Sequence, residues 1–107
     1  MIRGTTPTET YTLENPGVVD LNNCVEVWVS FHDYTGHTFT GGTDRLTLDE
    51  ENHEISLTLT QEETLALAVG KCLVQIRFLY NTGAAFATEP AYFEVENVRK
   101  DGVIYVD

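Results

Sequence analysis

The sequence predicts an all-β sandwich, and three observations carry that prediction. Apolar and polar residues alternate with a period of two along most of the chain, as they do in strands with one buried face. Clusters of turn-forming Gly, Asn and Asp separate these stretches at intervals of about 8–12 residues. Only one stretch, between residues 60 and 70, has a helical character. With 107 residues, the chain is expected to form a single domain over 1–107.

The first half of the chain predicts a short strand, a long strand and an extended arm. The first strand is "TYTL" at 10–13, which lies between Pro7 and "NPG" at 15–17 and is expected at a sheet edge. Residues 25–32 predict the long strand, after which "DYTG" turns the chain into the extended "HTFT". The alternation of the long strand predicts one buried face, formed by Val25, Val27, Val29 and Phe31.

The second half predicts two hairpins and a short last segment. In the first hairpin, "DRLTL" and "HEISLTL" are joined by "DEEN", which places the leucines of the first arm opposite the apolar residues of the second. In the other hairpin, "KCLVQIRFLY" and "AAFATEPAYFEVENV" flank "NTG", and Pro90 marks a bulge or an edge. "KDG" then turns the chain into "VIYV".

The helical stretch decides the fold class. Thr60 and Glu63 form the sequence pattern of a capping box, and Gly70 stands where a left-handed C-terminal cap belongs, so a helix of about nine residues is predicted near 61–69. Such a helix is too short for the parallel crossover of a doubly wound fold. We therefore expect it to carry the chain between two sheets of an immunoglobulin-like β-sandwich with about seven to eight strands.

The charge of the chain excludes some classes of partner. There are 17 acidic and 6 basic residues, which gives a formal net charge of −11. This charge disfavours nucleic acid and anionic membrane surfaces, and no apolar run approaches the roughly 20 residues that span a membrane. The N-terminus does not resemble a secretory signal, so the expected product is cytosolic and begins at its own Met.

The two cysteines are predicted to be free thiols. Cys72 shares the apolar face of its strand, whereas Cys24 is predicted on the same side as Trp28, away from the core. Side chains on opposite faces do not form a disulfide, and reduced thiols agree with a cytosolic product.

Residues capable of catalysis or metal binding are few. His32, Asp33 and His37 in "HDYTGH" are residue types that bind zinc, but they flank a turn and lack the close Cys or His spacing of known sites. They support only the least favoured hypothesis, a small metal-dependent enzyme. No nucleophile or phosphate-loop motif is present, so we expect neither catalysis nor a cofactor.

A candidate partner-binding surface follows from the outward faces of two strands. Trp28 faces outward from the strand at 25–32, as do Leu73, Arg77 and Leu79 from the strand at 72–80. If both strands lie in one sheet, the four side chains form an apolar patch that contains an arginine, a composition enriched at binding hot spots. The alternative is that residues 37–42, or the chain after Val98, cover this face.

Three stretches resemble a known group of proteins: "MIRGTTPTETYTL", "ISLTLTQEETLALAVGKCLVQIRFLYNTGAAFAT" and "FEVENVRKDGVI". They are similar to small proteins of the tail and baseplate gene clusters of bacteriophages and prophages of Gram-positive bacteria. Their layout resembles the immunoglobulin-like N-terminal domain of phage baseplate upper proteins. The resemblance covers about two-thirds of the chain and implies no catalytic residue. Baseplate upper proteins continue into further regions, whereas this sequence stops at Asp107.

The leading hypothesis is a non-enzymatic structural component of a phage or prophage virion that acts through protein–protein contacts. Its expected partners are tail or baseplate proteins, or further copies of itself. Its expected location is the virion and, before assembly, the cytoplasm of the bacterial host. The alternative is a free-standing binding module for a carbohydrate or a host factor.

Overall fold

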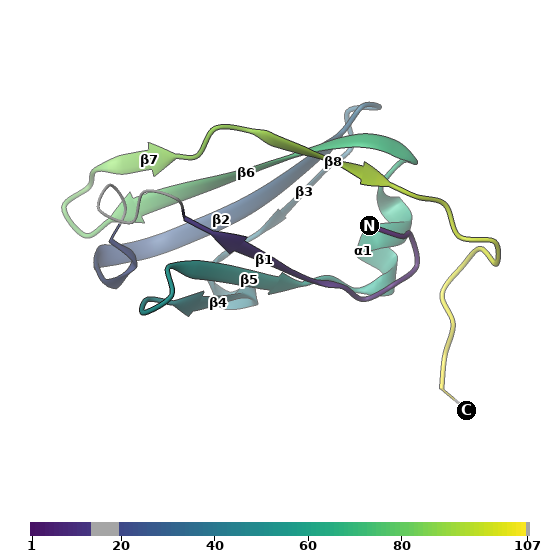
Figure 1. Cartoon of the computed structure of the whole chain (residues 1–107), viewed down its shortest axis with the longest axis horizontal. Coiled ribbons are helices and arrows are strands. Elements are labelled where there is room, and N and C mark those ends of the chain that lie inside the picture. The colour runs from purple at the N-terminus through teal and green to yellow at the C-terminus, as the bar shows by residue number, and fades with distance from the viewer. Residues whose placement is uncertain (14–19, 107) are drawn as a thin grey trace.

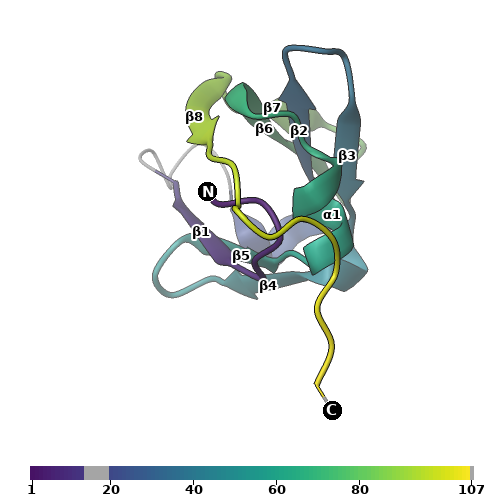
Figure 2. The same cartoon turned by 90° about the vertical axis from the view of Figure 1, so that its right-hand side faces the viewer.

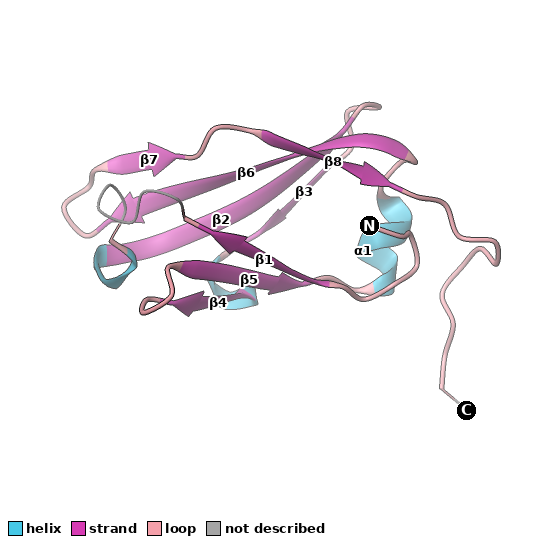
Figure 3. Ribbon diagram, in the orientation of Figure 1, coloured by secondary structure: helices cyan, strands magenta, loops and turns pink. Residues whose placement is uncertain are grey.

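The computed structural model describes residues 1–13 and 20–106, in which eight strands form two antiparallel sheets (Figures 1 and 3). The "NPG" segment lies outside these residues. The predicted mostly-β, sandwich-like architecture with one short helix is confirmed. The strands are β1 (Thr8–Thr12), β2 (Cys24–Asp33), β3 (Thr38–Gly41), β4 (Leu46–Asp49), β5 (Glu54–Thr58), β6 (Gly70–Tyr80), β7 (Ala85–Ala87) and β8 (Ala91–Val95); the α-helix is α1 (Gln61–Ala66), and 3-10 turns lie at Leu21–Asn23 and Thr43–Arg45.

The smaller sheet has the order β1-β5-β4, and the larger has the order β3-β2-β6. The remaining edge of β6 is shared by β7 at one end and β8 at the other. Both predicted hairpins are present, but the run at 84–98 is two strands. They are separated at Thr88, whose N–H and hydroxyl both bond the backbone of Ile76 (2.9 and 3.1 Å), just before Pro90. Proline has no N–H group to donate to a neighbouring strand, so the break between β7 and β8 lies at Pro90, where the sequence predicts a bulge or an edge.

The core lies between the two sheets and is built by alternation. Every second residue from Val27 to Asp33 in β2 and from Cys72 to Phe78 in β6 points inward and is buried against the inner face of β5 and the segment around α1. Each fully buried aliphatic or aromatic side chain contributes about 1.5–3 kcal/mol. The central members from the larger sheet are Val27, Val29, Phe31, Cys72, Val74, Ile76 and Phe78, and those from the smaller sheet are Ile55 and Leu57.

The start of β2 departs from the predicted alternation. The pairing register with β6 shifts between Cys24 and Glu26, and a one-residue shift exchanges the two faces of a strand. Val25 is therefore 51% exposed instead of buried, and Cys24 packs against the core instead of lying on the Trp28 side.

The two cysteines are nevertheless free thiols, for a different reason from the predicted one. Cys24 pairs with Tyr80 and Cys72 pairs with Asp33, at the two ends of the β2–β6 ladder. Nine residues of strand, about 30 Å, separate these ends, and a disulfide needs Cα atoms within about 7 Å.

Helix α1 joins β5 in the smaller sheet to β6 in the larger one, as predicted. The capping box is present: Glu63 N–H donates to Thr60 Oγ1 (3.2 Å), and Thr60 N–H donates to Glu63 Oε1 (2.8 Å). The helix is shorter than predicted, six residues instead of about nine, and Gly70 is not its cap. It ends because the next residue, Leu67, turns extended and buries its side chain in the core.

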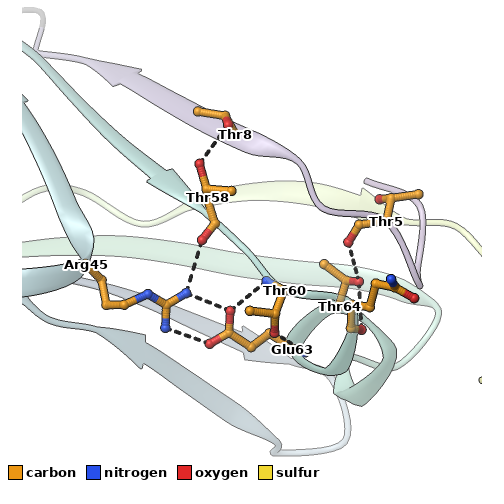
Figure 4. A network of polar contacts seen from close by, with 8 residues as sticks. Thr5, Thr8, Arg45, Thr58, Thr60, Glu63 and Thr64 are labelled. Atoms are coloured by element: carbon orange, nitrogen blue, oxygen red, sulfur yellow. Dashed lines mark hydrogen bonds and ion pairs between the residues drawn. The ribbon is translucent and has the colours of Figure 1, made fainter. Parts of the chain in front are cut away.

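Arg45 connects this helix to the end of β5 and to β3, and Figure 4 shows its bonds to Glu63 and Thr58. Its guanidinium makes two parallel hydrogen bonds to the Glu63 carboxylate, each 2.8 Å, and a third to the carbonyl of Thr58 (3.1 Å). It also lies 5.7 Å from the centre of the Phe39 ring on β3. One side chain thus contacts β3, the end of β5 and the first turn of α1.

The N-terminal residues close the same end of the sandwich. Met1 and Arg3 run parallel to the end of β8, where Glu96 N–H donates to the Met1 carbonyl (2.7 Å) and Arg3 N–H donates to Glu96 O (2.9 Å). The Arg3 guanidinium donates to Leu65 O (2.8 Å) and Asn97 Oδ1 (2.9 Å). The chain then enters β1, so this segment connects the larger sheet to the smaller one.

The segment after Val98 extends away from the body beside α1 (Figures 1 and 2). The predicted "VIYV" segment is extended but is not part of a sheet as far as the structure describes the chain. The Gln61 side-chain amide holds it like a neighbouring strand: Gln61 Nε2 donates to Ile104 O (2.9 Å), and Ile104 N–H donates to Gln61 Oε1 (2.8 Å).

The contact between Arg45 and Glu63 should be measurable as a coupling energy. In a double-mutant cycle of Arg45→Ala and Glu63→Ala, urea unfolding should give a coupling of about 1 kcal/mol, because the pair is bidentate but partly solvated. Glu63→Ala alone should cost more than Arg45→Ala, since it also removes the cap. The control is Glu62→Ala, an exposed neighbour in the same turn; a coupling near zero would show that Arg45 does not secure α1.

Candidate docking surface

The outward face of the larger sheet brings three of the four predicted partner-binding residues together. Trp28 and Arg77 are direct partners across β2 and β6, and Leu79 lies opposite Glu26 in the next outward-facing row. Their sequence neighbours Val27 and Phe78 are buried in the core, so alternation places these three side chains on the outer face.

A shallow hollow of ≈ 390 Å³ lies over these residues. Trp28 forms part of its wall and sits close to Gly42, where an added Cβ would come within 3.8 Å of the indole Cδ1. The hollow crosses the sheet from β3 to β7 at the end remote from α1. Its lining residues are Trp28, Ser30, Thr40, Arg77, Phe78, Leu79 and Ala85.

Leu73 does not belong to this hollow. It lies four residues before Arg77 on β6, about 13 Å away along the strand. Its neighbours in the sheet are His32 on β2 and Tyr92 on β8. The side chains of Ser30 and Gln75 form the polar row between the two groups. The single patch that the sequence predicts is therefore two separate groups.

Neither of the two predicted covers lies over the hollow. β3 lies beside β2 as the edge strand of the same sheet, so the chain around residues 38–41 extends the face instead of covering it. The chain after Val98 leaves at the α1 end, where Ile104 bonds Gln61. Within the described residues the one ion pair is Arg45–Glu63, so no carboxylate among them neutralises Arg77.

Of the four lining residues outside the predicted set, two lie on strands that the sequence did not place beside this face. Thr40 reaches the hollow because β3 pairs with β2 and places it beside Ser30, 3.1 Å away between hydroxyl oxygens. Ala85 reaches it through the pairing of β7 with Leu79. The alternation of each strand indicates which side these residues face, but the lateral order of strands comes only from the fold.

The structure does not bring His32, Asp33 and His37 together as a metal site. His32 is exposed on the outer face, whereas Asp33, the next residue of the strand, points to the opposite side and is buried. His37 lies across the turn, where its carbonyl accepts from Asp33 N–H (3.0 Å). Among residues 1–13 and 20–106, no group of three His, Cys, Asp or Glu side chains is placed to hold a metal ion.

Asp33 instead organises the turn and its contact with the α1–β6 connection. Asp33 Oδ1 accepts from the N–H groups of Thr35 and His37 (both 3.0 Å) and from the Thr35 hydroxyl (2.6 Å), while Oδ2 accepts from Ala68 N–H (2.9 Å). Burial alone would raise the pKa of Asp33, but these hydrogen bonds to the charged form outweigh it and lower the pKa from 3.8 to about 2.

Comparisons with protein-family models, curated proteins and solved structures found no match to this chain. In the part of the chain that the structure describes, no helix is long and apolar enough to cross a membrane.

The Asp33 contacts predict a specific acid dependence of stability. Because the folded-state pKa lies below the unfolded-state value near 3.8, the contribution of Asp33 is present above about pH 4 and is lost as the pH falls towards 2. The difference in unfolding free energy between wild type and Asp33→Asn should therefore be constant above about pH 5 and shrink between pH 4 and 2.

Urea unfolding at a series of pH values measures this difference. Asp101→Asn, at an exposed aspartate in the C-terminal segment, is the control for the loss of one negative charge. A difference between wild type and Asp33→Asn that did not change down to pH 2 would contradict the assignment.

Proposed function

We propose that this chain is a non-enzymatic structural component of a phage or prophage virion, associated with the tail or baseplate, and that it acts by docking through the hollow at Trp28. The observation that carries the proposal is the presence of an indole, an unneutralised guanidinium and a leucine in one hollow on the outer face of the larger sheet, where the indole and the leucine are half-buried. Large aromatic residues and arginine dominate the binding energy of many protein interfaces.

The proposed sandwich type is immunoglobulin-like. The sheet orders β1-β5-β4 and β3-β2-β6-β7 correspond to strands B-E-D and C′-C-F-G of that architecture. The passage from β5 to β6 through α1 corresponds to the E–F crossover between sheets. This correspondence of strand order supports the proposed immunoglobulin-like type. The sequence signature of antibody domains does not contribute, because those domains bury a tryptophan whereas Trp28 faces outward.

The resemblance to phage tail-cluster proteins supports the virion role. Its three stretches, which are distant in sequence, meet at one end of the sandwich: Arg3 of the first bonds Leu65 of the second and Asn97 of the third. Gln61 of the second bonds Ile104 of the third in the same region. The three stretches that carry the resemblance are therefore in contact with one another in the same part of the fold.

The alternative function is a binding module for a carbohydrate or a host factor. One observation favours it: the hollow combines the Trp28 indole with the hydroxyls of Ser30 and Thr40 and the Arg77 guanidinium. Aromatic rings offer an apolar surface to a sugar ring, and the polar groups could bond its hydroxyls.

Substitution of Trp28 tests docking directly. Trp28→Ser, alone and with Leu79→Ser, should leave the circular dichroism spectrum unchanged, because both side chains lie on the outer face. The same variants should weaken binding to purified tail proteins or to further copies, measured by light scattering or calorimetry, by about tenfold or more.

The control is Val69→Ser. Val69 is exposed in the connection between α1 and β6 and does not line the hollow, so this variant should bind normally. Unchanged binding by the Trp28 variants would place the interface elsewhere, and loss of folding would place Trp28 in the core. Loss of binding to a glycan array, with protein binding unaffected, would favour the alternative function.

A further inference from the structure

The outer edge of β1 is a row of backbone groups that no strand of the described chain covers. β1 is an edge strand of the smaller sheet and pairs with β5 (Figure 2). Two bonds show which residues face β5: Leu59 N–H donates to Pro7 O (3.0 Å), and Leu13 N–H donates to His53 O (2.9 Å). In an antiparallel pair, residues that bond the partner strand alternate with residues whose N–H and C=O point away from it.

Thr8, Thr10 and Thr12 are therefore the residues of β1 whose N–H and C=O groups point away from β5. Along residues 1–13 and 20–106, these backbone groups have no hydrogen-bond partner. The pairing with β5 holds them in one line, at a spacing of about 6.8 Å between alternate residues. Such a row on a fixed edge is a template for the addition of another strand.

The proposed sandwich type has a strand at this position. In the immunoglobulin-like architecture, β1, β5 and β4 correspond to strands B, E and D, and strand A lies beside strand B. Here the residues that precede β1 take another course, because Met1 and Arg3 bond Glu96 at the end of β8 in the larger sheet. The place beside β1 thus receives no strand from the described chain, and what would complete the sheet is an extended segment.

Glu9 gives this edge a charge preference. Its side chain is half-buried and lies on the same side of β1 as Tyr11, which packs against the core. Burial, and after it the nearby Glu9 carboxylate, raise the pKa of the Tyr11 phenol. No hydrogen bond or ion pair of the Glu9 side chain is present in the part of the chain that the structure describes. A basic side chain in an added strand would neutralise this carboxylate, whereas an acidic one would be repelled.

A second copy of this chain fits the edge poorly. Antiparallel pairing of two β1 edges would place the Glu9 carboxylates of both copies on the same face of the joined sheet, and each body carries a net charge of −11. The extended segment Val103–Val106 has no basic residue to offer. The charge of the edge therefore favours a strand from a different protein.

We propose that β1 accepts an extended segment of a different protein as an added antiparallel strand, with a Lys or Arg side chain of that segment beside Glu9. The backbone groups of Thr8, Thr10 and Thr12 supply the affinity, and Glu9 supplies the selectivity. This inference rests on the proposed immunoglobulin-like type. It adds to the docking at Trp28 a second contact on the other sheet, so the two contacts can be tested separately.

Amide hydrogen exchange measured by NMR on the full chain tests this arrangement residue by residue. The probe is the acetylated and amidated peptide Thr-Val-Thr-Lys-Thr-Val-Thr in excess, and its counterpart carries Glu in place of Lys. The lysine peptide should slow exchange at Thr8, Thr10 and Thr12 by about tenfold or more, because their N–H groups face the open edge. Exchange at Glu9 and Tyr11 should change little, since these N–H groups already face β5.

Two substitutions separate the backbone contact from the charge contact. Thr10→Pro removes an outward N–H group and no bond to β5, so it should abolish peptide binding and leave the circular dichroism spectrum unchanged. Thr10→Val keeps the N–H group and is the matched control. Glu9→Lys should reverse the preference between the two peptides, by about threefold in each direction, and it carries the test if Thr10→Pro does not fold.

Three results would overturn the inference. The first is unchanged exchange at Thr8, Thr10 and Thr12 in excess lysine peptide, or slowed exchange in β3 or β4 instead. The second is slowed exchange at these amides that rises with protein concentration without peptide, which would make a second copy the occupant. The third is loss of peptide protection in Trp28→Ser, which would place the peptide in the hollow. Docking at Trp28 is judged by its own variants, which leave β1 intact.

Discussion

The rest of the structure depends on the pairing between β2 and β6. This ladder aligns the two longest strands, so that one set of alternate residues closes the core and the other set forms the outer face. The same register that buries Val27 against the core places Trp28 directly beside Arg77. A shift of one residue would exchange these faces and expose the core, so burial fixes the geometry of the hollow.

Several polar contacts that join distant segments of the sandwich lie at the end that contains α1. Arg45 bonds Glu63 and Thr58, Arg3 bonds Leu65 and Asn97, and Asp33 bonds Ala68. These contacts hold together segments that are far apart in sequence, and they give the extended C-terminal segment a rigid base. The hollow is lined by residues of β2, β3, β6 and β7 away from α1, so the two ends of the molecule have different surfaces.

Local patterns predicted the features that depend on neighbouring residues. Alternation correctly placed Trp28 and Arg77 on the outward sides of β2 and β6, and the spacing of Thr60 and Glu63 predicted the capping box. Features set by distant contacts were not predictable in the same way. The early end of α1 depends on the burial of Leu67 against both sheets, and the separation of Leu73 from the hollow depends on the strand register. Thr40 was missed because its place depends on which strand lies beside β2.

The central claim of this account is that the hollow at Trp28 becomes buried when the protein assembles. Trp28 is the only tryptophan of the chain, so its fluorescence reports on the hollow without a label. Acrylamide quenching should be measured across the concentration range in which light scattering detects association. The account predicts that quenching decreases and the emission shifts to shorter wavelength as assemblies form. Quenching and emission that stay constant while assemblies form would contradict it.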